Sequence, residues 1–217
     1  MKRYRDRTEA GVKLASELND YAGTDAVVLG LARGGVPVAA EVARALGLPL
    51  DVMVVRKLGV PGREELAMGA IASGGMRVLN SDVLDQLTIS EEMLARTAVE
   101  EERELVRMER IYRQGRGAEK LEGRTVILVD DGLATGASMR AAVAAVREHG
   151  PSKIVVAVPV AARETCRRVG SLADDVLCVL TPEPFRAVGV WYDDFSETTD
   201  QDVRELLNRS WGGDEQG

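Results

Sequence analysis

Short apolar runs alternate with helical patterns along most of this 217-residue chain, and this alternation is the feature that most constrains its fold. The runs are rich in Val, Ile and Leu, as in strands that are covered on both faces. Strands separated by helices are typical of the α/β class. We therefore expect an open, mostly parallel five-stranded sheet with helices on both faces. The predicted strands are 26–31, 50–55, 125–130, 153–160 and 175–180, and the predicted helices are 8–20, 36–46, 136–149, 161–170 and 200–210.

The segment 56–124 interrupts this alternation. It begins with a glycine-rich stretch, RKLGVPGREELAMGAIASGG, for which we expect a flexible loop, and MRVLN then predicts a short strand. Residues 90–114 are predicted to form one long inserted helix, because apolar residues recur there at three-, four- and seven-residue spacings. The EEERE run of this helix is expected to face solvent. The apolar positions are Leu94, Ala98, Leu105, Met108 and Tyr112.

Length and composition limit the organisation and the chemistry. We expect a single domain over 1–211 and a disordered tail at 212–217. The single histidine, His149, lies where Gly-Pro ends a predicted helix, so we expect a helix-terminal role for it and chemistry without imidazole. The net charge of −7 argues against nucleic acid as a partner.

The compartment is also predicted from composition. Cys166 and Cys178 are too few and too widely spaced for a zinc site, and a reducing cytoplasm is expected. No apolar run reaches the roughly 18 residues of a membrane helix. The start, MKRYRDRTEA, lacks the apolar stretch of a signal peptide. We therefore expect a cytoplasmic protein with no membrane partner.

The most informative stretch is VILVDDGLATGASM (126–139), in which an apolar strand ends in Asp130 and Asp131. A turn of small residues follows, and a helix begins near Gly136, so the turn offers backbone N–H groups, two hydroxyls and a positive dipole end. These groups suit a phosphate dianion, whereas the carboxylates suit a ribose diol or a metal. Adjacent acids at the end of an apolar strand are costly to bury without a partner. The segment therefore predicts a site for a ribose 5-phosphate.

This motif resembles the phosphoribosyl pyrophosphate signature of type I phosphoribosyltransferases. The resemblance implies that Asp130 and Asp131 hold the ribose hydroxyls. It also implies that the 5-phosphate is held by Ala134, Thr135, Gly136, Ala137 and Ser138. The Walker A and GxGxxG patterns of other nucleotide-binding folds are absent from the sequence. Together with RDRxEAG (5–11) and RKLGVPG, the DDGxATG pattern is most similar to a bacterial subgroup with no settled acceptor.

Two further segments resemble parts of this family. The stretch GLARGGVP (30–37) resembles the loop that binds pyrophosphate, which often contains a non-proline cis peptide, here Ala32–Arg33. Arg33, Gly34 and Gly35 would bind the ligand, and a plain glycine turn is the alternative. Arg56 and Lys57, at the end of strand 50–55, resemble the Arg-Lys pair of orotate and adenine phosphoribosyltransferases, the alternative being a solvated basic pair. The glycine-rich loop would close over the site and bring Arg63 with it.

The resemblance implies that a nitrogenous base attacks C1 of phosphoribosyl pyrophosphate and pyrophosphate leaves. Catalysis would depend on orientation and charge stabilisation, with Arg56, Lys57, Asp130 and Asp131 as the catalytic candidates. Arg33, Arg56 and Lys57 would neutralise pyrophosphate together with Mg²⁺. Most Mg²⁺ ligands would be substrate and water oxygens, and Asp131 is the candidate protein ligand.

Acceptor specificity in this family comes from a small hood, for which the candidate is 181–199. Its candidate contact residues are Phe185, Val188, Trp191, Tyr192 and Asp193, because aromatic rings stack on planar bases. The alternative is that the aromatics pack the hood against the core. A purine-like base in nucleotide salvage is the expected acceptor, although Ala134 replaces the Asp of enzymes that act on 6-oxopurines. Gly132 also departs from the aliphatic residue of most members.

Two other functions are alternatives to transfer. The first is a regulator of the same fold, which would sense phosphoribosyl pyrophosphate or a nucleotide without catalysis. Residues 1–25 are too short for the winged helix of DNA-binding regulators. The Arg56–Lys57 pair also favours catalysis. An amidotransferase would need a nucleophilic N-terminal Cys, whereas the chain begins Met-Lys. Members of the family often form homodimers, for which helix 90–114 is a candidate surface.

Overall fold

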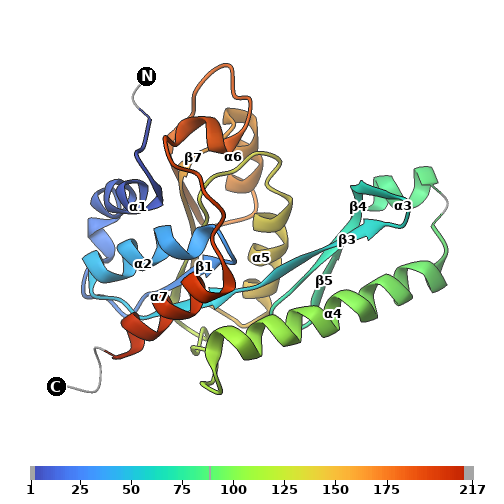
Figure 1. Cartoon of the computed structure of the whole chain (residues 1–217), viewed down its shortest axis with the longest axis horizontal. Helices are drawn as coiled ribbons and strands as arrows, with labels where there is room; N and C mark the ends of the chain where they lie inside the picture. The colour runs from blue at the N-terminus through green and yellow to red at the C-terminus, as the bar shows by residue number, and fades with distance from the viewer. Residues whose placement is uncertain (1–2, 88, 213–217) are drawn as a thin grey trace.

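The computed structural model describes residues 3–87 and 89–212, and a five-stranded parallel sheet lies at its centre (Figure 1). Its order is β2-β1-β6-β7-β8, and every pairing is parallel. The chain leaves β1 toward β2 on one side and later returns to β6 on the other, so the order reverses between β1 and β6. Ligands of open α/β sheets bind at such a switch point. The strands are β1 (Val27–Leu31), β2 (Leu50–Met53), β6 (Thr125–Val129), β7 (Lys153–Val160) and β8 (Asp175–Leu180).

Alternate residues of the central strands enter cores on opposite faces of this sheet. Val28 and Ile127 pack with one group of helices, and Val27 and Leu128 pack with another. Because both faces are covered, the strands are apolar throughout, and the predicted α/β sheet is confirmed. The first group is α1 (Arg7–Ser16), α2 (Gly35–Leu46) and α7 (Asp200–Gly212), and the second is α5 (Ala137–Glu148) and α6 (Arg163–Gly170).

The stretch predicted to be a flexible glycine-rich loop is a β-hairpin, so that prediction is wrong. Strands β3 (Val55–Val60), β4 (Arg63–Ala72) and β5 (Met76–Leu79) form a second, antiparallel sheet. Helix α3 (Ser81–Leu87) follows, and α4 (Glu91–Arg113) runs along this sheet. Figure 1 shows these elements projecting from the parallel sheet. The predicted strand at MRVLN and the long helix are confirmed.

Apolar packing explains why the hairpin is ordered. Helix α4 buries Ala98, Leu105 and Tyr112 of its predicted stripe in a core shared with Leu58 and Met68 of the hairpin. Such burial contributes about 1.5–3 kcal/mol for each large apolar side chain. The glycines of β3 and β4 interrupt the apolar pattern, and for this reason neither strand was predicted from the sequence.

The acidic run of α4 does more than face solvent. Glu101 lies 2.7 Å from Arg56 of β3, and Glu102 lies 3.0 Å from Arg77 of β5. The predicted solvent-facing run therefore supplies two ion pairs to the hairpin sheet.

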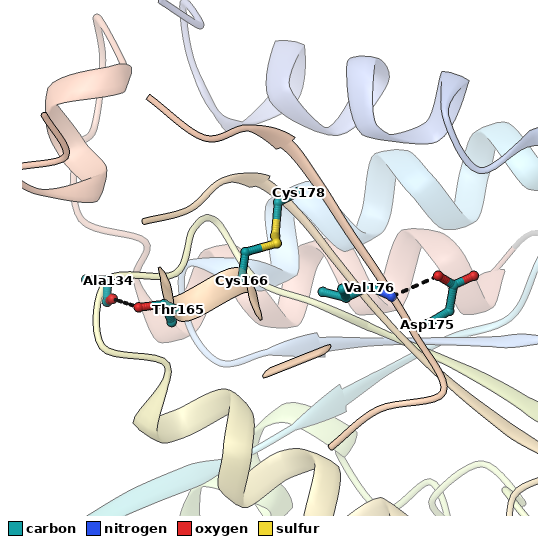
Figure 2. Close-up of a disulfide and its surroundings, with 6 residues drawn as sticks. All are labelled: Ala134, Thr165, Cys166, Asp175, Val176 and Cys178. Carbon is teal, nitrogen blue, oxygen red and sulfur yellow. Dashed lines mark hydrogen bonds between the residues drawn. A yellow bond between two sulfur atoms is a disulfide. The ribbon is translucent and has the colours of Figure 1, made fainter. Parts of the chain in front are cut away.

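The two cysteines form a disulfide between α6 and β8 (Figure 2). This bond was not predicted from the sequence. Helix α6 packs against β8, and this brings the Cα atoms of Cys166 and Cys178 to 6.6 Å although the residues are 12 apart in sequence.

The remaining expectations concern the termini of elements. His149 caps the C-terminus of α5, as predicted. Of the tail predicted to be disordered, Gly212 ends α7, and 213–217 lie outside the described residues. In the described part of the chain, no helix is long and apolar enough to cross a membrane.

Candidate functional site

The predicted phosphate turn lies at the carboxyl edge of the parallel sheet. Strand β6 ends at Val129, Asp130 and Asp131 follow directly, and the turn 134–138 leads into the 12-residue helix α5. Gly136 is the N-cap of α5 and has a left-handed backbone (φ 74°), which favours glycine. The other four turn residues are exposed. The turn is therefore an accessible helix N-terminus of the kind that binds phosphate.

Helix α6 contacts this turn and supports it, a feature that the sequence analysis did not predict. The Thr165 hydroxyl donates a hydrogen bond to the Ala134 carbonyl at 2.6 Å (Figure 2). A Cβ on Gly136 would lie only 2.7 Å from Thr165 Cγ2. The disulfide of the next residue, Cys166, fixes α6 to β8. No local signal marks Thr165, because its contact joins residues 31 positions apart.

The predicted pyrophosphate loop lies against the carboxylate pair. Its Ala32–Arg33 peptide bond is cis, as the resemblance implied. A Cβ on Gly35 would lie 2.6 Å from the Val129 carbonyl, and one on Gly34 would overlap a carboxylate oxygen of Asp131. Glycine is therefore required for the close approach of these two segments. The structure brings Gly34, Gly35, Asp130 and Asp131 together.

The three predicted cations have different surroundings. Arg33 forms ion pairs with Glu197 and, at 3.7 Å, with Asp200. Since β2 ends at Met53, Arg56 is not at a strand end but inside β3, where it pairs with Glu101.

Lys57 is exposed, and its side chain makes no hydrogen bond or ion pair within 3–87 and 89–212. Arg63 begins β4 of the hairpin rather than a mobile lid. The structure thus places Arg33 beside the carboxylates. It links neither Arg56 nor Lys57 to them by a hydrogen bond or ion pair among the described residues.

A further cation, Arg7, sets the electrostatics of the carboxylate pair. Its Nε and Nη2 both lie 2.9 Å from Asp131 Oδ2. Burial raises the pKa of the Asp131 carboxyl, and Arg7 opposes that rise. Burial, followed by the charge of Asp131, raises the pKa of Asp130 well above its ordinary value.

The predicted hood packs on the N-terminal segment. Tyr192 is buried, its ring lies 5.6 Å from that of Tyr4, and its hydroxyl donates to the Asp131 carbonyl at 2.6 Å. Its ring therefore packs the hood against the core, which is the alternative given above. Val188 occupies the space beside Gly132, where a Cβ would lie 2.6 Å from it, and this explains the unusual glycine. Phe185 and Trp191 are partly buried in the same cluster, whereas Asp193 is exposed.

A cavity of about 420 Å³ opens between the hood, the predicted pyrophosphate loop and Asp131. Two guanidinium groups and two carboxylates face it, so it can take a polyanion together with a cation. A larger cleft, of about 740 Å³, lies between α2, the start of β2 and α7 and shares no lining residue with this cavity. The cavity at the site is lined by Arg7, Arg33, Gly34, Asp131, Phe195, Glu197 and Thr198.

The fold and the loops at its switch point define an α/β protein with a sugar-phosphate type of site, and comparison with known proteins gives the family. The family model described as a phosphoribosyl transferase domain matches residues 4–194. The chain therefore belongs to the phosphoribosyltransferase family. It is 47% identical over 212 residues to a Mycobacterium tuberculosis protein named "Putative phosphoribosyl transferase MT0597". That match covers 97% of this chain and 47% of the relative, so the chain spans about half the relative's length.

Two solved structures extend this comparison. The protein TT1426 from Thermus thermophilus is 46% identical with a TM-score of 0.82, over 95% of this chain and 98% of that one. The AQ2163 protein from Aquifex aeolicus is 13% identical with a TM-score of 0.51, over 93% and 84% of the two chains, and shows likeness of fold alone.

Proposed function

We propose that this protein transfers ribose 5-phosphate from phosphoribosyl pyrophosphate to a nitrogenous base and releases pyrophosphate. One observation carries the proposal: the Asp130–Asp131 pair lies between an open phosphate turn and the loop 32–35, at the switch point of the sheet. This place combines a helix N-terminus, two partly buried carboxylates and close backbone approach. Such a site recognises a sugar through its diol and its phosphate.

The donor would be held at two points. Backbone N–H groups at the start of α5 and the hydroxyls of Thr135 and Ser138 would bind the 5-phosphate. Asp130 and Asp131 would accept hydrogen bonds from the ribose hydroxyls, which offsets the cost of burying these carboxylates. Fixing both ends of the ribose leaves C1 in a defined position for attack.

The leaving group would lie in the cavity beside Arg33 and Gly34. A nitrogen of the base bonds to C1 while the bond from C1 to the pyrophosphate oxygen breaks, and the electron pair leaves with pyrophosphate. The nitrogen releases its proton to solvent. Positive charge from Arg33 and Lys57 would stabilise the charge that develops on the leaving oxygen.

Mg²⁺ fits the donor set of this cavity, because Asp131 and Glu197 both line it. Among the described residues, no three His, Cys, Asp or Glu side chains gather into a group that could hold a metal. Asp131 and Glu197 would share the ion with phosphate oxygens and water, as Mg²⁺ prefers. When bound, the ion would supply further neutralisation of pyrophosphate.

The acceptor would enter between the hood and the carboxylates. We propose a purine-like base, which would meet the partly exposed ring of Phe195 at the lining of this cavity. Reaction in the cytoplasm as part of nucleotide salvage, and a homodimer, complete the proposal.

A pyrophosphate-release screen tests this function. The protein is incubated with phosphoribosyl pyrophosphate, Mg²⁺ and a panel of nitrogenous bases, and release is compared among wild type, Asp131→Asn and Lys57→Ala. The exposed residues Asp20 and Lys120 provide matched control variants, Asp20→Asn and Lys120→Ala. Release with one base that only the site variants abolish is expected. Tight binding without release on the whole panel would indicate the regulator instead, and no binding would overturn both.

A further inference from the structure

Arg7 is the first residue of α1, yet its guanidinium lies inside the candidate site. The side chain is only 12% exposed, which is unusual for an arginine. Both Nε and Nη2 lie 2.9 Å from Asp131 Oδ2, and Nη1 donates to the Ser196 carbonyl at 2.7 Å. The Arg7 Cζ atom lies 4.0 Å from the centre of the Phe195 ring. One largely buried guanidinium therefore joins three segments: α1, the end of β6 and the hood.

These contacts leave a defined part of the carboxylate available. Both nitrogens of Arg7 bind the same oxygen, Oδ2, and Oδ1 of Asp131 makes no hydrogen bond to any residue that the structure describes. The Asp131 backbone is also held, because Tyr192 donates to its carbonyl. Arg7 thus fixes the direction of a carboxylate whose second oxygen is free to accept a hydrogen bond.

The chemistry of these contacts requires an arginine. A guanidinium is planar and presents several N–H groups in fixed directions, so it can serve one carboxylate oxygen, one carbonyl and one aromatic face together. A lysine ammonium is a point charge and reproduces only part of this set. The hood itself, 181–199, contains a single basic residue, Arg186, which is exposed. Arg7 therefore supplies the cation that connects the hood to the carboxylate pair.

We propose that Arg7 is a positioning residue of the transfer reaction. It orients the Asp131 carboxylate so that Oδ1 receives a ribose hydroxyl, and it holds the hood over that hydroxyl. This inference rests on the proposed function, because it assigns Asp131 to the ribose.

Two ligands separate the role of Arg7 from that of the phosphate turn. Calorimetry is run with ribose 5-phosphate, which carries the diol, and with inorganic phosphate, which lacks it. Arg7→Met should weaken ribose 5-phosphate binding by roughly tenfold or more, the scale of a charge-assisted hydrogen bond, and leave phosphate binding unchanged. Arg7→Lys should lie between Arg7→Met and wild type. The control is Arg5→Met, since the Arg5 side chain is 77% exposed, and it should match wild type.

A double-mutant cycle completes the test. If Arg7 acts through Asp131, then Arg7→Met combined with Asp131→Asn should weaken binding no more than the weaker-binding single variant does. Equal losses for ribose 5-phosphate and inorganic phosphate, or strictly additive losses, would overturn the inference. If Arg7→Met fails to fold, Arg7→Lys carries the test, and wild-type affinity in that variant would overturn it. Failure of the wild type to bind ribose 5-phosphate would instead overturn the proposed function.

Discussion

Replacing Gly136 with alanine should destabilise the protein through two separable effects. The residue has φ 74°, and the left-handed region costs a residue with a Cβ about 1–2 kcal/mol. The new Cβ would lie 2.7 Å from Thr165 Cγ2, and overpacking of this kind costs about 1–3 kcal/mol. We therefore expect Gly136→Ala to lower the free energy of unfolding by roughly 2–5 kcal/mol.

Thr165→Ser separates the two effects. Serine keeps the hydroxyl that binds the Ala134 carbonyl but lacks Cγ2, the atom that an alanine at 136 would meet. Urea unfolding of wild type, both single variants and the double variant gives the coupling energy. The double variant should recover the overpacking part, about 1–3 kcal/mol, and retain the backbone part. Stability of Gly136→Ala within about 0.5 kcal/mol of wild type, or no coupling with Thr165→Ser, would refute the reasoning.

Three further predictions concern other parts of the molecule. Reducing the disulfide, or Cys166→Ser, should lower the free energy of unfolding by about 3 kcal/mol on the chain-entropy model, which urea titrations with and without reductant will show; no change would contradict the bond. The backbone N–H of Ile154, and then Arg147, hold the pKa of Asp174 below its ordinary value of 3.8. The ionised Asp174 carboxylate therefore stabilises the fold fully above the pKa that it has in the unfolded chain, and this stabilisation is lost as pH falls through its lower pKa in the folded protein. Asp174→Asn should therefore make the free energy of unfolding fall less steeply at acidic pH. Lys57→Ala should reduce kcat for pyrophosphate release while the melting temperature stays unchanged, because the side chain is exposed; an equal loss of stability would show a structural role instead.

The parallel sheet could be predicted because each of its strands has a clear local sequence pattern. Runs such as TVILV and KIVVAVPV are apolar on both faces, and the helices between them show clear periodicity. The hairpin β3–β4 could not be predicted in the same way. Its glycines interrupt the alternation, and its order depends on packing against Ala98 and Leu105 of α4, which lies well beyond it in the chain. Non-local packing overrode the local composition there.

The site, like the fold, could be predicted only where its residues are contiguous in the sequence. The Asp130–Asp131 pair, the turn and the glycines of the second loop are contiguous motifs, and their chemistry follows from residue type. Arg7 and Thr165 reach the site only through the fold, because 124 and 31 positions separate them from Asp131 and Ala134. The RDRxEAG pattern around Arg7 was a signal, but nothing in the sequence said where its guanidinium would lie.

Direct binding of phosphoribosyl pyrophosphate tests the central claim most closely. Calorimetric titration into the wild-type protein with Mg²⁺ should give one saturable site per chain, and Asp131→Asn should weaken it while the exposed control Asp20→Asn does not. Binding that is absent in the wild type, or equally tight in Asp131→Asn, would contradict the assignment of the carboxylate pair to the ribose.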